Sequence, residues 1–171
     1  MPKPPSGSYP VYFKKYIDLV AQNNINAAFA AQQNIINDYF ISLPAKKHLY
    51  KYAKGKWTLK EVLQHLIDCE RIFAYRALCT ARKEKQNILP FEENDYAKNS
   101  KANGRKWVHL CDEFIAVRQS TQFLIESFNT EQLKALGKVN GNKINALALA
   151  FICVGHVYHH INIINERYLA E

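Results

Sequence analysis

The chain has 171 residues, of which 48% are hydrophobic and 22% are charged, and this ordinary globular balance excludes an intrinsically disordered protein. We expect one domain with a sizeable core, because two independent cores in a chain of this length would each be small. The net charge is +8 at neutral pH, and a lysine-rich stretch at residues 46–60 holds part of it. Lysines in an expected loop, without arginine, favour a solvated basic surface over nucleic-acid binding.

The N-terminal residues 1–10 hold four of the six prolines, so we expect a flexible arm that precedes a domain at residues 11–171. The arm lacks the apolar region of a signal peptide. The longest apolar run, residues 146–155, is short of the roughly 20 residues that cross a bilayer. We therefore expect a cytoplasmic protein with no membrane segment. The cysteines show no Cys-x-x-Cys spacing, which argues against a disulfide framework or a zinc knuckle.

Apolar residues recur at three- and four-residue intervals over long stretches, which predicts that helices dominate the fold. A short first helix is expected at residues 11–22. The next helix is expected at residues 25–42, and it ends before Pro44 because proline cannot continue an α-helix.

The following helix begins at Thr58, because Thr58 and Glu61 have the spacing of a capping box. It extends to the charged segment 82–85, and its apolar stripe includes His65. A long connection is expected at residues 86–104. Connections of this length inside a compact domain often carry function.

A further long helix is predicted at residues 104–128, followed by a short turn of helix at residues 131–136. Gly137 and Gly141 mark a turn, and the last helix is predicted at residues 142–169. The predicted fold class is all-α: a four-helix bundle with a short extra N-terminal helix.

Three of the six histidines, His156, His159 and His160, lie within five residues of the predicted last helix. Since His156 and His160 are four residues apart, their side chains stack on one helix face about 6 Å apart. Such a pair can place two imidazole nitrogens on one divalent ion such as zinc, nickel or iron. His65 is the best candidate for a third ligand, because it alone among the other histidines lies on the apolar stripe of a long helix. The alternative is that these histidines are ordinary core residues.

Two strings, with an arginine between them, carry a resemblance to a known family. Residues 57–70 read Trp-Thr-x-x-Glu-x-x-x-His-x-x-x-x-Glu, Arg118 follows, and residues 155–160 read Gly-His-x-x-His-His. In this order and spacing the chain resembles the DinB-like superfamily over residues 11–169. The resemblance implies a bundle of DinB-like topology, often a homodimer, with a metal on one histidine of the second bundle helix and two of the last. These map onto His65, His156 and His160.

After the final histidine, many members continue with Arg-Gly-Gln, whereas this chain has Ile161, Asn162 and Ile163. It therefore resembles the branch with the Gly-His-x-x-His-His ending rather than the better understood thiol-transferring members. The family's DinB proteins are damage-induced bacterial proteins, so the resemblance also implies a bacterial stress-response setting.

Three imidazoles on one side of a divalent ion leave coordination positions open for water or a thiol. The ion would lower the pKa of bound water toward about 7, or hold the thiol as thiolate. We therefore expect a metal-dependent hydrolase or thiol S-transferase acting on a small molecule. The alternative is a catalytically silent metal-binding bundle with a role in stress response or protein interaction.

Several neighbours of the histidines are candidates for proton transfer or for support of the ligands. His159 lies about 60° around the helix from His156, so it faces either the rim of the site, as a general base, or solvent. Asp68, Glu70 and Tyr158 are the other candidates. Glu70 is rotated by about 140° from the histidine five residues before it, which favours a structural ion pair over metal ligation.

Two cysteines lie one turn from the expected ligands, Cys69 near His65 and Cys153 near His156. Either thiol offers a substitute metal ligand. Packing is the favoured role for both, because free cysteine behaves as a small hydrophobe.

Overall fold

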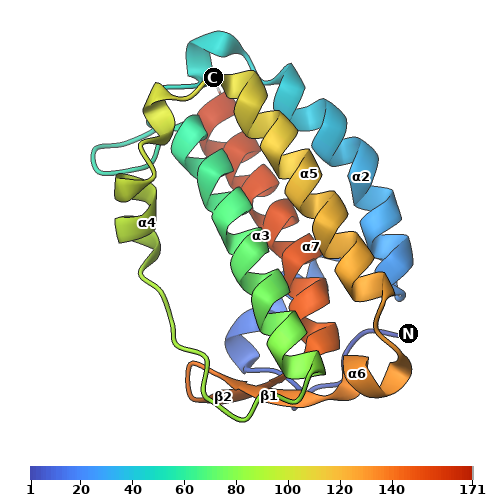
Figure 1. The fold of residues 1–171 in the computed structure, drawn as a ribbon. Coiled ribbons are helices and arrows are strands. Elements are labelled where there is room, and N and C mark those ends of the chain that lie inside the picture. The colour runs from blue at the N-terminus through green and yellow to red at the C-terminus, as the bar shows by residue number, and fades with distance from the viewer. Residues whose placement is uncertain (171) are drawn as a thin grey trace.

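The computed structural model describes residues 1–170, so Glu171, the end of the predicted domain, lies outside the described residues. Figure 1 shows four long helices side by side, which confirms the predicted all-α bundle. They are α2 (Ile25–Ser42), α3 (Leu59–Ala81), α5 (Trp107–Glu126) and α7 (Ala146–Ile163). The shorter helical segments include η2 (Ala45–Lys47), α6 (Thr130–Lys134) and η4 (Ile164–Leu169), a π-helical continuation of α7.

Side-chain caps fix where the first two bundle helices begin. The Asn24 side chain accepts hydrogen bonds from the backbone of Asn26 and Ala27, so α2 has the predicted bounds. At the start of α3, the Thr58 hydroxyl accepts from the Glu61 backbone at 3.1 Å, and the Glu61 carboxylate accepts from the Thr58 backbone at 2.8 Å. The predicted capping box is therefore present.

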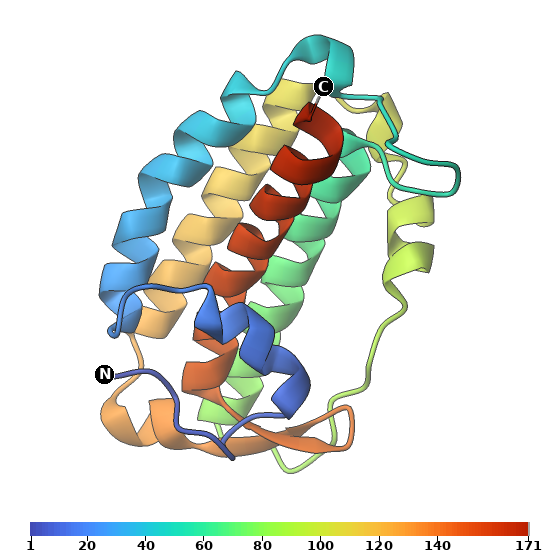
Figure 2. The ribbon, with the colours of Figure 1, turned by 180° about the vertical axis from the view of Figure 1, so that it is seen from behind.

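The N-terminal helix is shorter than predicted. The expected helix at residues 11–22 is replaced by η1 (Val11–Phe13) and α1 (Lys14–Asp18). The chain turns after α1 so that Val20 becomes fully buried, and a helix this short is held by packing rather than by its own propensity. Figure 2 shows α1 lying across α7 at the back of the bundle.

Residues 1–10 lie against the bundle in this structure. Pro4 is buried, and the carbonyl of Ser8 accepts a hydrogen bond from the Asn145 backbone at 3.0 Å. The flexibility of this arm in solution stays a prediction.

The prediction that the last helix begins at residue 142 is wrong, because a β-hairpin occupies those residues. Its strands are β1 (Leu136–Val139) and β2 (Asn142–Asn145), which pair antiparallel. The turn residues Asn140 and Gly141 have φ angles of 48° and 74°, the pattern of the two-residue turns that Asn-Gly favours. Asn145 then caps α7 by accepting from the Ala148 backbone at 2.7 Å.

The long connection between α3 and α5 includes helical segments that the sequence did not predict. It contains α4 (Glu93–Asn99) and η3 (Ala102–Gly104). Before α4, the backbone of Ile88 donates to the Lys138 carbonyl at 2.9 Å and accepts from Asn140 at 2.8 Å. The connection is thereby anchored to the hairpin.

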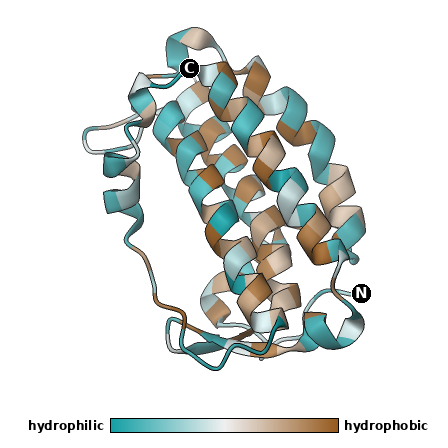
Figure 3. Ribbon diagram, in the orientation of Figure 1, coloured by the Kyte–Doolittle hydropathy of each residue, from teal (hydrophilic) through white to brown (hydrophobic). Residues whose placement is uncertain are grey.

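The central helix of the bundle is α7, which packs against α1, α2 and α3. By length and composition alone, residues 146–169 would suffice to cross a membrane, but 78% of the most apolar window is buried inside the protein. Figure 3 shows apolar residues along this helix. A helix that is apolar on nearly all sides is what the centre of a bundle requires.

Candidate metal centre

The adjacent helices α3 and α7 bring three histidines together in the core. Nε2 of His156 lies 3.3 Å from Nε2 of His65 and 3.1 Å from Nε2 of His160. The rings of His65 and His160 are 5.0 Å apart between centroids. All three side chains are buried, with exposed fractions of 4% for His65, 6% for His156 and 9% for His160.

Burial keeps these imidazoles neutral. It lowers the pKa of His65 to about 4, with a further contribution from His159. Burial, followed by repulsion from neighbouring histidines, holds the pKa of His156 and of His160 well below the usual range. Neutral imidazoles keep a lone pair free, and this is the form that binds a divalent metal.

The spacing of two of the three nitrogen pairs fits ligands on a transition-metal ion. Two ligand nitrogens, each about 2.0–2.1 Å from a tetrahedral zinc ion, lie about 3.3–3.4 Å apart. The contacts of His156 with His65 and His160 are close to this value. Imidazole is also a preferred ligand of zinc, iron and nickel.

Cys69 forms a second donor set with two of the same histidines. Its sulfur lies 3.6 Å from both ring nitrogens of His65, and ligand atoms of Cys69, His65 and His156 all lie within 4.8 Å of one another. Burial raises the pKa of the Cys69 thiol far above its usual value, so the thiol stays protonated in the absence of a metal. Cys153 is also buried, and its carbonyl accepts a hydrogen bond from Arg118 on α5.

Aromatic rings enclose the histidines on several sides. Tyr16 of α1 packs edge to face on His156, with 5.4 Å between centroids, and Phe73 of α3 packs on the same ring at 5.7 Å. Trp57 lies 4.7 Å from His65. These contacts hold the imidazole planes and limit the access of water.

Gly155 explains how α1 comes so close to the site. A Cβ atom at this position would lie 2.0 Å from the carbonyl oxygen of Tyr16. Only glycine therefore permits this approach of α1 to α7, and the approach places the Tyr16 ring over His156.

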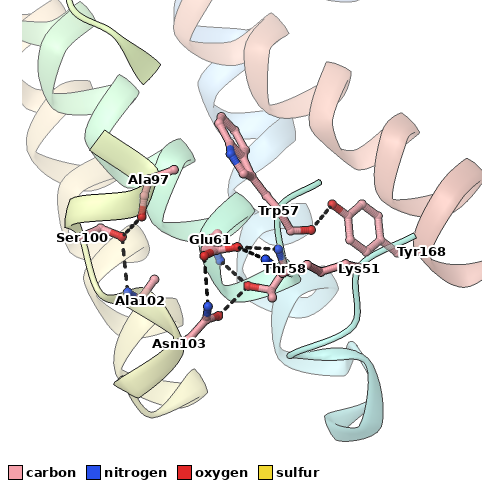
Figure 4. A network of polar contacts seen from close by, with 9 residues as sticks. All are labelled: Lys51, Trp57, Thr58, Glu61, Ala97, Ser100, Ala102, Asn103 and Tyr168. Carbon is pink, nitrogen blue, oxygen red and sulfur yellow. Dashed lines mark hydrogen bonds and ion pairs between the residues drawn. The ribbon is translucent and has the colours of Figure 1, made fainter. Parts of the chain in front are cut away.

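A polar network fixes Trp57 on the other side of the site, as Figure 4 shows. The Tyr168 hydroxyl donates to the Trp57 carbonyl at 2.7 Å. Asn103 accepts from the Thr58 hydroxyl at 2.6 Å and donates to Glu61 at 3.0 Å. Hydrogen bonds thus connect the start of α3 both to η4 and to η3, and α3 carries His65.

A cavity of about 350 Å³ opens onto the histidines. His65, Cys69 and His156 contribute to its wall, and its other lining residues include Tyr16, Phe73, Arg76, Phe91, Glu93 and Asn140. A smaller cavity of about 210 Å³ meets His160 from the side of Trp57 and Tyr168. Nδ1 of His160 is buried and has no hydrogen-bond partner among residues 1–170.

The remaining candidates lie outside the cluster. His159 is half-buried, 5.2 Å from the rings of both Tyr16 and His160, and its pKa is lowered by burial and by Lys15. Glu70 accepts from Arg118 at 2.9 Å, so it forms the structural ion pair that its position on α3 favours.

The other two candidates face other parts of the protein. Asp68 accepts from Gln64 at 2.9 Å and lines a separate surface cavity. Tyr158 is half-buried beside Gln32 of α2, and burial raises the pKa of its hydroxyl. Neither residue lines the cavities that meet the three histidines.

Two residues of the site were not candidates in the sequence, although Arg76 lies on the same inward stripe of α3 as His65. Tyr16 reaches His156 only through the crossing of α1 and α7, and Arg76 enters the cavity from the last turns of α3. Gly155, inside an otherwise apolar helix, is the one local sign of a close approach.

Two comparisons with known proteins, one by sequence model and one by solved structure, gave matches. The sequence model of the DinB superfamily matches residues 28–164. No curated protein matches the chain. Among solved structures, YfiT from Bacillus subtilis, described as a probable metal-dependent hydrolase with an unusual four-helix bundle topology, superposes with a TM-score of 0.70 and 18% identity. The match covers 96% of this chain and 91% of YfiT, and it shows a shared fold.

Proposed function

Since the chain belongs to the DinB superfamily, we propose that it is a metal-dependent hydrolase of a small molecule, with one divalent transition metal on His65, His156 and His160. The observation that carries this proposal is a cluster of three buried imidazoles, in which Nε2 of His65 and of His160 both lie close to Nε2 of His156 and in which His65 and His156 line a cavity. The description of YfiT as a probable metal-dependent hydrolase supports it.

The three-histidine set is favoured over the set that includes Cys69. The distances fit both sets, since Nε2 of His160 is 3.1 Å from Nε2 of His156 and the Cys69 sulfur is 3.6 Å from the His65 nitrogens. The protonation of the donors separates the two sets. The histidines are already neutral, while the buried thiol would have to lose its proton before it could bind. Cys69 is then part of the cavity wall.

His65, His156 and His160 would hold a zinc, nickel or iron ion, which would supply a nucleophile by lowering the pKa of a bound water or thiol. The chain's own residues supply the enclosure. Tyr16 and Phe73 cover His156 and exclude water from one side. Burial raises the pKa of the Tyr16 hydroxyl, so Tyr16 keeps its proton and serves as a hydrogen-bond donor at the cavity wall.

His159 is assigned a supporting role at the rim. It packs against Tyr16 and His160, but it does not line the larger cavity. Transfer of a thiol instead of hydrolysis would use the same metal and the same cavity, with the thiol in place of water as the nucleophile.

The test is turnover of a panel of esters, amides and activated thiol acceptors by untagged protein. We expect hydrolysis that is lost with a chelator, restored by metal, and abolished in His160→Ala. His109→Ala, which changes an exposed histidine on α5, is the matched control and keeps full activity. A fully metal-loaded protein that turns over no member of the panel would contradict the proposal and favour a catalytically silent bundle.

A further inference from the structure

Arg76 is a buried cation without an anionic partner. Its side chain is 6% exposed, and none of the ion pairs between described residues includes it. Its Nε has no hydrogen-bond partner in the described part of the chain, and one Nη donates to the Leu89 carbonyl at 3.2 Å. The guanidinium also lies over the Phe91 ring, 5.8 Å from its centroid. Because a guanidinium stays charged in proteins, these neutral contacts leave room for an anion to complete the site.

Arg118 in the same bundle differs from Arg76 in having an anionic partner, although its Nε and Nη1 also lack hydrogen-bond partners among the described residues. Arg118 is 4% exposed and pairs with the Glu70 carboxylate at 2.9 Å. Arg76 has a comparable burial but lies at the wall of the 350 Å³ cavity. Glu93 is the carboxylate among the lining residues, and it is exposed and forms no ion pair with Arg76.

The position of Arg76 on α3 sets the geometry of a ligand. Arg76 follows His65 by eleven residues, which is three full turns plus about 20°, so the two residues share one helix face about 16 Å apart along the axis. Side chains of a helix point toward its N-terminus, so the arginine reaches back along the cavity toward the histidines. Cys69 and Phe73 lie between them on α3 and give the cavity an apolar middle.

We propose that Arg76 binds the carboxylate of an elongated small molecule whose other end reaches His65 and His156. A carboxylate matches the planar fork of a guanidinium, and a single arginine beside an exposed glutamate suits a monoanion better than a dianion. The apolar middle of the cavity, formed by Phe73, Phe91 and Tyr16, accepts an aliphatic or aromatic segment. This assignment of a substrate class rests on the proposed function, but carboxylate binding is measurable without turnover.

The test is calorimetric titration of the untagged protein with phenylacetate, phenylbutyrate and phenylhexanoate, and with the corresponding neutral amides. Each titration is made on metal-loaded and on chelator-treated protein. We expect at least one carboxylate to bind both forms and its amide to bind at least about tenfold more weakly, because a hydrogen-bonded charge pair is lost.

The variant Arg76→Gln is expected to weaken carboxylate binding by at least about tenfold and to leave amide binding unchanged. Arg82→Gln removes the same charge from an exposed position at the end of α3 and is expected to bind as wild type does. Without ligand, Arg76→Gln should melt no lower than wild type, because it removes an unpaired buried charge. If this variant does not fold, the comparison of acid with amide on the wild-type protein decides.

Equal affinity for acids and amides, no binding of any acid, or no effect of Arg76→Gln would overturn the proposal. Binding to the metal-loaded form alone, indifferent to Arg76→Gln, would show that the carboxylate ligates the metal, and this too would overturn it. Failure of the proposed function has a different signature, since a protein that holds no metal and turns over no substrate can still bind the carboxylate at Arg76.

Discussion

The backbone of Tyr16 lies so close to Gly155 that a Cβ atom on the glycine would be 2.0 Å from the Tyr16 carbonyl oxygen. This contact seats α1 on α7 and brings the Tyr16 ring over His156, the residue that follows the glycine. Gly155 therefore determines how His156 is covered. The glycine allows α1 to approach α7, and the Tyr16 ring of α1 then packs on His156.

Gly155→Ala is expected to displace α1 and to destabilise the protein by about 1–3 kcal/mol, the usual range for overpacking a core. Urea denaturation of the variant against wild type measures the effect. Gly104→Ala is the control, because a Cβ at Gly104 meets no atom within 4 Å. Equal stability of Gly155→Ala and Gly104→Ala would show that α1 is not held by this contact.

The metal-free protein should lose stability as pH falls below about 6.5. The folded pKa of His65 is about 4, and those of His156 and His160 are also lowered, so the unfolded chain takes up protons that the folded chain excludes. The stability that these three neutral imidazoles contribute is fully present above the unfolded pKa, and it is lost as the pH falls toward 4. For His65 alone the loss amounts to about 3 kcal/mol.

Denaturation of chelator-treated protein at a series of pH values checks this dependence. His65→Gln should show a smaller slope between pH 6.5 and 4 than wild type does. His109→Gln, which changes an exposed histidine, should keep the wild-type slope. A wild-type stability that is flat over this window would mean that the three imidazoles are protonated in the folded protein.

Glu70 and Arg118 form the most deeply buried ion pair among the described residues, with exposed fractions of 2% and 4% and a separation of 2.9 Å. Glu70→Ala should cost about 3–5 kcal/mol, because it leaves a buried guanidinium unpaired. The double variant Glu70→Leu with Arg118→Met should recover most of this loss.

The exposed pair Lys14–Asp18 is the control for that prediction, and Asp18→Ala should cost less than about 1 kcal/mol. Chemical denaturation of the single and double variants gives all the required free energies. A double variant that is no more stable than Glu70→Ala would show that the two effects are independent.

The sequence predicted those parts of the fold that local patterns specify. The Thr58 and Glu61 capping box placed the start of α3, and Asn24 with Pro44 bracketed α2. The hairpin was missed even though Asn140 and Gly141 are a hairpin signal, because the neighbouring residues also fit the apolar pattern of the last helix. The sequence around residue 142 fits both a hairpin and the start of a helix. In the structure the hairpin forms, and its strand β1 also pairs with the backbone of Ile88.

The part of the site that follows from helix periodicity could be predicted from the sequence. The four-residue spacing of His156 and His160 placed both on one face, and the apolar stripe of α3 pointed His65 inward. Periodicity says nothing about which helices are neighbours, so it gave no role to Tyr16, and it placed Arg76 on the inward stripe of α3 without showing the cavity beside it. Their place at the site depends on the seating of α1 and on the cavity between α3, the hairpin and the connection to α4.

Metal analysis by plasma mass spectrometry on untagged protein is the first measurement for a metal on the three histidines. Wild type, His109→Ala and Cys69→Ala should each carry close to one zinc, nickel or iron per chain, and His65→Ala, His156→Ala and His160→Ala should each lose it. Loss in Cys69→Ala with retention in His160→Ala would instead assign the ligands to His65, Cys69 and His156. Substoichiometric metal that is indifferent to all of these changes would contradict the account and leave the three imidazoles as packed core residues.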